Sequence, residues 1–111
     1  MENLCEIKDI FKKIHQFEQE LNNEVNVTIN EAMVLCSIYE TIKCSGDISA
    51  DTGISTSRTS RVLLSLEQKG YIIRSFDGAD KRKMMFELTS EGVKKKLEIS
   101  EIDFNLDFNV Q

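Results

Sequence analysis

Apolar side chains recur every three or four residues over the first part of the chain. The series consists of Leu4, Ile7, Phe11, Ile14 and Leu21, with Ile10 and Phe17 beside it. This spacing predicts an amphipathic helix over about residues 3–22 that ends at Asn22-Asn23. Because the apolar face is wide for a single terminal helix, we expect part of it to meet another subunit.

The stretch VTINEAMVLCSIYETIKC, residues 27–44, has the pattern of a second helix. Thr28 and Glu31 form a capping-box pattern, which marks a helix start. The expected apolar face consists of Ala32, Leu35, Cys36, Tyr39 and Ile42. On that face we expect Cys36 to take part in packing.

Two further helices are predicted within the stretch SGDISADTGISTSRTSRVLLSLEQKGYI. The first covers about Asp47–Thr52 and is ended by Gly53. The second begins after Ser55, a good N-cap, and ends before Gly70. The side chains of the second helix that should face a core are Thr59, Val62, Leu63 and Leu66. Two helices joined by so short a turn are typical of a helix-turn-helix.

The runs YIIRSF and KMMFEL, residues 71–76 and 83–88, flank a turn-like Asp-Gly sequence. Both runs are strand-like, so they predict a β-hairpin. The following stretch, LTSEGVKKKLEISE, predicts another helix capped by Thr89 or Ser90. We therefore expect a mainly α (α+β) fold in which a small β-hairpin accompanies the helix-turn-helix.

The last segment, IDFNLDFNV, alternates strictly between apolar and polar residues from Ile102 to Val110. A period of two, with Asp and Asn disfavouring helix, predicts a strand or an extended arm. A terminal strand with one apolar face needs a partner, so we favour a partner-dependent arm over a disordered tail.

Charge is distributed unevenly along the chain, whose 111 residues suit a single domain with a net charge of −5. Residues 55–83 carry seven Lys/Arg and three Asp/Glu, whereas residues 1–54 and 84–111 have net charges of −6 and −3. Acidic flanks would confine a bound polyanion to the basic central window.

Several functional classes are not supported by the sequence. No apolar run approaches the roughly 20 residues that span a bilayer, and the first residues lack a signal-peptide pattern. We therefore expect a cytoplasmic protein without a membrane partner. The three cysteines and the single histidine, His15, show neither metal-ligand spacing nor a catalytic constellation. We expect no enzymatic activity, no metal and no cofactor.

The second helix of the helix-turn-helix has an outward face suited to DNA. Ser57, Ser60, Arg61 and Gln68 should point away from the core, and Arg58 lies on the flank with enough reach to turn outward. Small hydroxyl residues allow close approach to a major groove, while arginine can contact guanine or phosphate. A merely solvated helix face would more often carry Glu, Lys and Gln.

The segments LEQKGYIIR and DKRKMMFELTSEG carry a family resemblance. From about Thr28 to Lys96 the chain resembles the winged helix-turn-helix regulators of the multiple-antibiotic-resistance regulator (MarR) family. Together with the patterns at the two ends of the chain, the resemblance indicates a single winged-helix domain over residues 1–111, with an N-terminal helix (1–22), a winged-helix core (28–96) and a C-terminal arm (101–111). It also implies a homodimer that binds pseudo-palindromic double-stranded DNA, usually as a repressor and often under the control of a small-molecule effector.

Contacts to DNA are implied residue by residue by the same resemblance. Arg82 would be the wing-tip residue in the minor groove, and Asp80 would orient Arg82 or Arg74. Lys81 and Lys83 would add phosphate contacts. The residues implied for the major groove and its phosphates are Thr56, Ser57, Arg58, Ser60 and Arg61.

The resemblance weakens after Gly92, which only 19 residues follow, whereas the family usually has a long final helix that pairs with the first helix in the dimer. The first helix and the Ile102–Val110 arm are the expected substitutes. Two alternatives remain open: an interaction module that reads no DNA, and a redox sensor acting through Cys5. Acidic Glu2 and Glu6 beside Cys5 favour an inert thiol.

Overall fold

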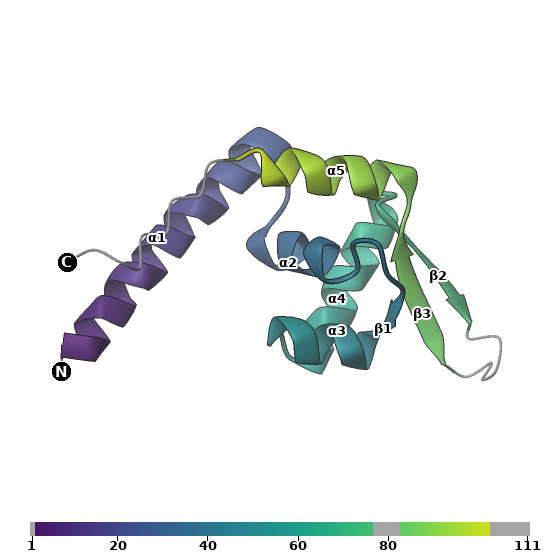
Figure 1. The fold of residues 1–111 in the computed structure, drawn as a ribbon, viewed down its shortest axis with the longest axis horizontal. Coiled ribbons are helices and arrows are strands. Elements are labelled where there is room, and N and C mark those ends of the chain that lie inside the picture. Colours follow the sequence, from purple (N-terminus) through teal and green to yellow (C-terminus); the bar gives the residue numbers. More distant parts are fainter. Residues whose placement is uncertain (1, 77–82, 103–111) are drawn as a thin grey trace.

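The computed structural model describes residues 2–76 and 83–102 of the chain (Figure 1). Five helices and three strands follow one another along these residues. The elements are α1 (Glu2–Val25), α2 (Ile29–Ser37), β1 (Lys43–Cys44), α3 (Ser45–Thr52), α4 (Thr56–Gln68), β2 (Ile72–Phe76), β3 (Met84–Leu88) and α5 (Ser90–Ser100). This order confirms the predicted fold class, helix-turn-helix with a β-hairpin wing.

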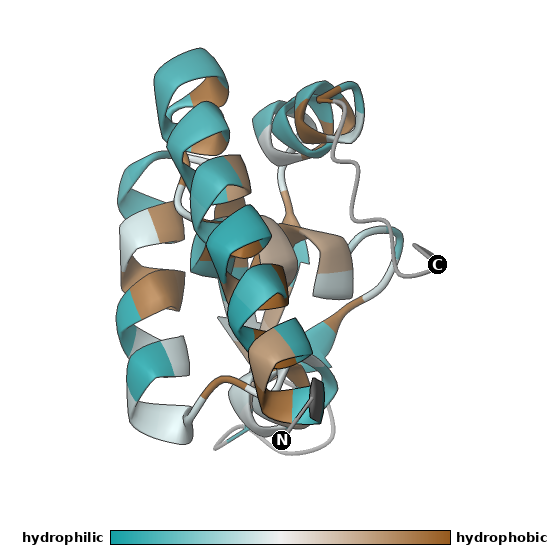
Figure 2. Cartoon of the chain, turned by 90° about the vertical axis from the view of Figure 1, so that its left-hand side faces the viewer, coloured by the Kyte–Doolittle hydropathy of each residue, from teal (hydrophilic) through white to brown (hydrophobic). Residues whose placement is uncertain are grey.

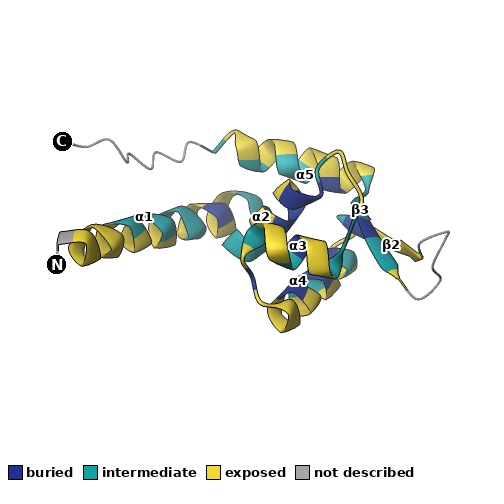
Figure 3. Ribbon diagram, turned by 60° about the horizontal axis from the view of Figure 1, so that its bottom comes forward, coloured by how far each residue is buried: buried dark blue, intermediate teal, exposed yellow. Residues whose placement is uncertain are grey.

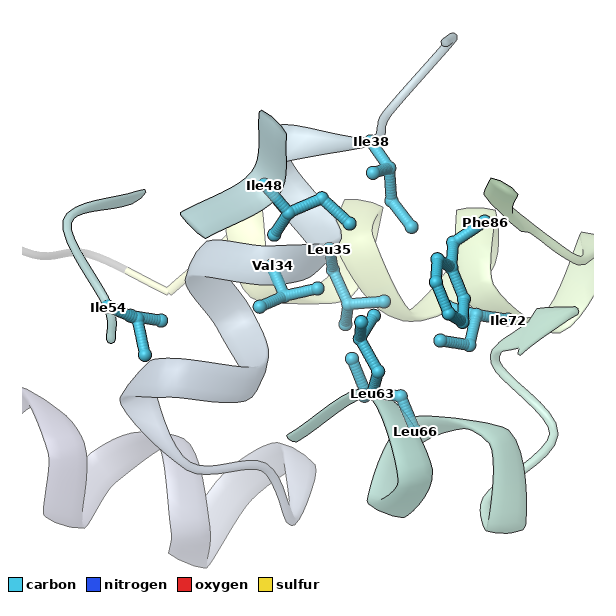
Figure 4. Close-up of a cluster of buried hydrophobic side chains, with 9 residues drawn as sticks. All are labelled: Val34, Leu35, Ile38, Ile48, Ile54, Leu63, Leu66, Ile72 and Phe86. Atoms are coloured by element: carbon cyan, nitrogen blue, oxygen red, sulfur yellow. The ribbon is translucent and has the colours of Figure 1, made fainter. Parts of the chain in front are cut away.

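The helices α2, α3 and α4 pack together, with the sheet at one end and α5 across the top, whereas α1 extends away from this core (Figure 1). Nine apolar side chains fill the space between these helices and the sheet (Figure 4). They are Val34, Leu35, Ile38, Ile48, Ile54, Leu63, Leu66, Ile72 and Phe86. Every element of the core except β1 and α5 contributes to this cluster, so the helix-turn-helix and the wing share one hydrophobic core.

The sheet has the order β1-β3-β2 and is antiparallel throughout. In the hairpin, Ile72 pairs with Leu88 and Phe76 pairs with Met84. On the other side of β3, Lys43 pairs with Phe86. The hairpin was predicted from sequence, whereas β1 was not.

The predicted second helix was too long, because α2 ends at Ser37 and β1 occupies Lys43–Cys44. Glu40 has a φ of 60°, in the left-handed region that a continuing helix excludes. Without glycine or proline in residues 38–44, no local signal marks this ending. The two residues of β1 adopt an extended conformation because β3 offers them backbone partners.

The predicted apolar face of the second helix was also partly wrong. Cys36 and Ile42 are exposed, so Cys36 does not take part in core packing. The buried residues here are Glu31, Val34, Leu35, Ser37 and Ile38. Glu31, Val34, Leu35 and Ile38 follow the i, i+3, i+4, i+7 spacing. The three apolar ones belong to the core cluster that also contains Ile48 of α3 and Leu63 and Leu66 of α4.

The start of α2, the end of α3 and the start of α4 follow the predicted signals closely. Thr28 and Glu31 form both hydrogen bonds of the capping box, and the hydroxyl of Ser55 accepts from the N–H of Arg58. Gly53, with a φ of 79°, ends α3 in a left-handed conformation that other residues adopt only with strain. The turn into α4 is therefore encoded locally. Helix α1 runs three residues beyond the predicted end, to Val25.

The Leu-Thr-x-x-Gly sequence closes the wing against the end of α4. Thr89 donates its hydroxyl to the carbonyl of Gly70 at 2.7 Å and accepts from the N–H of Gly92 at 3.0 Å. A Cβ at Gly92 would lie only 2.0 Å from the carbonyl oxygen of Tyr71. Only glycine therefore lets α5 start this close to the α4–β2 connection.

Candidate nucleic-acid interface

The outward face of α4 is formed by side chains from its first two turns. The predicted contact residues Thr56, Ser57, Arg58, Ser60 and Arg61 are all exposed. On the inward face, Thr59, Leu63 and Leu66 are buried, and Val62 packs against the core. The sequence prediction of the two faces of this helix is thereby confirmed, although contact with DNA remains a prediction.

Side-chain hydrogen bonds fix the turn that orients α4. Thr52 accepts from the N–H of Ile54 at 3.2 Å and donates to the carbonyl of Ile48 at 2.8 Å. Thr59 donates to the carbonyl of Ile54 at 3.5 Å, and Ile54 itself is buried. Because both ends of the turn are bonded, α4 is presented by a rigid support.

Hydroxyl and guanidinium groups are arranged differently on the exposed face. Ser60 donates to the carbonyl of Thr56 at 3.2 Å, which keeps its side chain close to the helix surface. Within the described part of the chain, neither Arg58 nor Arg61 forms an ion pair with a carboxylate. Two arginines beside short side chains can therefore reach an anion without first breaking such a pair.

Arg74, by contrast, already has a carboxylate partner. Its Nε donates to Oε2 of Glu67 at 2.6 Å and its second terminal nitrogen donates to Oε1, which gives a two-pronged pair. The guanidinium also contacts Sδ of Met84 at 3.1 Å and lies 5.7 Å from the ring centre of Phe86. The hydrogen bonds between the two side chains lower the pKa of Glu67 and raise the pKa of Arg74.

Glu67 lies on α4 and Arg74 on β2, so this pair connects the helix to the base of the wing. The sequence prediction had offered Asp80 as a partner for Arg82 or Arg74. Arg74 is bonded to Glu67, whereas Asp80, Lys81 and Arg82 lie outside the described residues, so the contact predicted for Asp80 stays a prediction. Lys83, the one predicted wing-tip residue that is described, is exposed.

Sequence reasoning missed two polar clusters that position α4. One is the Glu67–Arg74 pair, whose members stand seven residues apart within LEQKGYIIR. The other joins buried Glu31 to Ser65 and Lys69 across more than thirty residues. Proximity within one motif was the only signal for the first pair, and the sequence held no signal for the second cluster.

Other kinds of site find little support in the described structure. Among residues 2–76 and 83–102, no three His, Cys, Asp or Glu side chains are grouped as metal ligands. No helix in the same residues is long and apolar enough to cross a membrane.

Comparison with known proteins identifies the arrangement of helices and wing. The sequence profile of the MarR family matches residues 27–84, just over half of the chain. This range runs from the N-cap region of α2 into the first residue of β3, so it contains the whole helix-turn-helix. Among curated protein sequences, none matches the chain.

Solved structures share the same fold. The transcriptional regulator BldR from Sulfolobus solfataricus has 22% identity and a TM-score of 0.84, over 91% of this chain and 73% of that one. YusO from Bacillus subtilis has 25% identity and a TM-score of 0.71, over 89% and 71%. A mutant MarR from E. coli, solved in complex with operator DNA, has 22% identity and a TM-score of 0.78, over 86% and 69%.

Proposed function

The chain belongs to the MarR family of transcriptional regulators, and on this basis we propose that it binds double-stranded DNA sequence-specifically as a homodimer. The observation that carries the proposal is the exposed first half of α4, where Arg58 and Arg61 stand among short hydroxyl side chains. A fully buried opposite face holds this surface in place. The E. coli MarR structure with operator DNA supports the same assignment by similarity of fold.

In the proposed complex, α4 enters the major groove. Arg58 and Arg61 would bond to guanine edges or phosphates, while Thr56, Ser57 and Ser60 allow the helix backbone to approach. The N-terminus of α4 adds partial positive charge near a phosphate. Major-groove contact by α4 would therefore supply most of the sequence discrimination.

The wing would contact the flanking minor groove. In this proposal Arg82 enters the groove, Asp80 orients an arginine, and Lys81 and Lys83 bind phosphates. Arg74 has a supporting role, because its pair with Glu67 holds the base of the wing against α4. The wing would increase the affinity for DNA and would fix the position of α4 along the duplex.

The proposed partner of the exposed half of α1 is a second copy of the chain. Leu4, Ile7 and Phe11 have exposed fractions of 66%, 46% and 56%. They are spaced three and four residues apart, so they form one apolar stripe (Figure 2). Pairing two such stripes would place two α4 helices on one pseudo-palindromic operator, and occupancy of that operator would repress transcription. The effector that would release DNA is an unidentified small molecule.

The test is the binding of a fluorescent duplex whose sequence is selected from random DNA by the wild-type protein. Affinity should fall steeply between low and physiological salt, because phosphate contacts release counterions. Arg61→Ala should weaken binding by about tenfold or more. Lys94→Ala, which removes the same charge from α5, is the matched control and should leave affinity nearly unchanged. A folded wild-type protein that ignores all duplexes at low salt would refute the proposal.

An interaction module that reads no DNA is the second candidate. The net charge of −5 and the exposed apolar half of α1 favour it. Deletion of residues 101–111 separates the roles: loss of a protein partner with DNA binding intact assigns the arm to protein interaction. Residues 103–111 lie outside the described structure, so the partner-dependent arm stays a prediction.

The redox alternative rests on Cys5, which is exposed on α1 close to the apolar stripe. It predicts that peroxide abolishes DNA binding and that Cys5→Ser prevents this loss. An unchanged response of the Cys5→Ser variant to peroxide would exclude this alternative.

A further inference from the structure

A buried carboxylate connects the start of α2 to the end of α4. Glu31 has an exposed fraction of only 3%. Its Oε1 accepts from the backbone N–H of Thr28 and from Nζ of Lys69, both at 2.9 Å, and its Oε2 accepts from the hydroxyl of Ser65 at 2.7 Å. Every oxygen of the carboxylate is bonded, so Lys69 is held in one place.

The same lysine also reaches the end of α1. Nζ of Lys69 donates to the carbonyl of Asn26 at 3.1 Å, one residue beyond the helix. Nζ of Lys95, on α5, donates to the carbonyl of Val25 at 3.0 Å. Asn26 has a φ of 57°, the left-handed conformation that ends a helix. Two ammonium groups from the core therefore hold the negative end of the α1 dipole.

Among the described residues, α1 has one buried side chain, Leu21, beside these bonds to the winged core. Its main packing partner there is α5, and most of its length is exposed or half-buried (Figure 3). Lys69 is the C-cap residue of α4, so its bond to Asn26 connects the end of α4 directly to the end of α1. In the described part of the chain, the angle between α1 and α4 thus depends on these bonds, on the burial of Leu21 and on the packing of α1 against α5.

We propose that Lys69, held by Glu31, is a positioning residue that sets the angle between α1 and α4 and thereby the half-site spacing that the dimer accepts. The inference rests on the proposed function, since it requires α1 to dimerise and α4 to bind DNA. In this proposal, the spacing specificity depends on residues that lie outside the proposed DNA contacts and outside the apolar stripe of α1.

Because α1 is long, a small rotation at its connection to the core, at Asn26, moves its far end by a large distance. A 24-residue helix is about 36 Å long, so a rotation of about 10° at Asn26 moves its far end by about 6 Å. One extra base pair between half-sites changes their separation by only about 3.4 Å, along with about 35° of rotation. A loosened joint would therefore let the dimer accept spacings that the wild-type protein rejects.

The experiment measures affinity for a set of duplexes in which the selected half-sites are moved apart or together by one and two base pairs. The wild-type dimer should prefer one spacing by about tenfold or more. Lys69→Met removes both bonds of the ammonium and keeps most of the alkyl stem. It should reduce that preference to less than about threefold while the mass in solution remains that of a dimer.

Lys43→Met is the matched control. Lys43 donates to the hydroxyl of Ser37 and to a carboxylate oxygen of Asp51, both at 3.3 Å. Like Lys69, it therefore pairs with a carboxylate and makes a second hydrogen bond, but it does not reach α1. Its spacing profile should equal that of the wild type. Lys69→Gln carries no charge but can still donate to Glu31 or to Asn26, so it should broaden the spacing profile less than Lys69→Met does. If Lys69→Met does not fold, Lys69→Gln takes its place in the experiment.

The outcomes separate the inference from the function on which it rests. A wild-type protein that is monomeric or binds no duplex overturns the proposed function and the inference with it. A wild-type dimer with a clear spacing preference, and a folded, dimeric Lys69 variant with the same preference, overturns the inference alone. Equal broadening by Lys43→Met would likewise overturn it, because loss of any surface lysine would then have the same effect.

Discussion

Helices α4 and α1 are both amphipathic, but they use their apolar faces differently. In α4, Leu63 and Leu66 are buried against the core of the same chain. In α1, Leu21 is buried near the C-terminal end, whereas Leu4, Ile7 and Phe11 are exposed (Figure 3). The same sequence pattern is thus covered within the chain in α4, whereas the N-terminal half of α1 keeps an exposed apolar stripe.

This difference suits the two helices to the different roles proposed for them, DNA contact for α4 and contact with a second copy of the chain for α1. A helix whose apolar face is buried internally can present a polar face that stays fixed, as DNA reading requires. A helix with an exposed apolar stripe gains free energy when a second surface covers it, at roughly 25 cal/mol per Å² of apolar area. The polar joint at Glu31, Lys69 and Asn26 connects the two helices.

The largest expected effect comes from the buried face of α4. Leu63→Ala should lower the free energy of unfolding by about 2–5 kcal/mol, because it leaves a cavity in the core. Leu64→Ala on the neighbouring position, where the side chain is 51% exposed, should change it by about 0.5 kcal/mol or less. Urea unfolding measures the free energy of unfolding of both variants. If Leu63→Ala and Leu64→Ala lowered it equally, burial of the apolar face of α4 within the chain would not be what distinguishes α4 from α1.

The next largest effect is expected on the exposed face of α1. If the proposed dimer forms through this stripe, Phe11→Glu should convert it into a folded monomer and weaken binding to a palindromic duplex by about 100-fold, or about 2.7 kcal/mol. Light scattering and fluorescence anisotropy measure the two changes. Gln16→Glu adds the same charge to the opposite face of α1 and should leave the dimer intact. A dimeric Phe11→Glu variant would contradict the proposed role of the stripe.

Acid should weaken the joint between the two helices. Burial by itself raises the pKa of Glu31, but hydrogen bonds from Thr28, Lys69 and Ser65 outweigh burial and lower the pKa below its ordinary value of 4.5. A lowered pKa in the folded state means that the carboxylate stabilises the fold above pH 4.5. That contribution is lost as the pH falls through the folded-state pKa.

Urea unfolding between pH 7 and pH 3 measures this dependence. The free energy of unfolding of the wild type should decrease more steeply on acidification than that of Glu31→Gln, whose side chain does not titrate. Asp51→Asn, which removes a more exposed carboxylate, should alter the slope less, because solvent screens its pair with Lys43. Parallel profiles for the wild type and Glu31→Gln would rule out this role for Glu31.

The smallest effect is expected where α4 meets the wing. A double-mutant cycle with Glu67→Gln and Arg74→Gln should give a coupling free energy of about 0.5–1 kcal/mol, since the pair is two-pronged but partly exposed. Chemical or thermal unfolding of the four proteins supplies the cycle. A coupling energy of zero would mean that α4 is tied to the wing by apolar packing alone.

Local signals in the sequence were sufficient for α3, α4, the hairpin and α5. Ser55, Gly53 and Thr89 end or begin helices through contacts within a few residues, and such contacts can be read from spacing alone. The exposed residues of α4 were found in the same way. Their contact with DNA, like that of the wing-tip residues, remains a prediction.

The sequence failed where long-range contacts decide the local structure. Residues 38–44 carry a helix-like pattern, yet Lys43 and Cys44 are extended because they pair with Phe86 and Met85 on β3. Cys36 lies on the side of α2 that α3 and α4 do not cover, so its exposure depends on how the helices pack. Periodicity indicates that a helix has an apolar face but does not say which neighbour will cover it.

By itself, the sequence determined the order of the helices and the hairpin strands, the two faces of α4 and the family resemblance, because all three depend on residues close together in the chain. Only the tertiary structure decided that Arg74 is bonded to Glu67, and that Glu31 and Asn26 meet the same lysine. Glu31 and Lys69 are 38 residues apart, and no spacing rule connects two residues whose distance is set by the packing of whole helices.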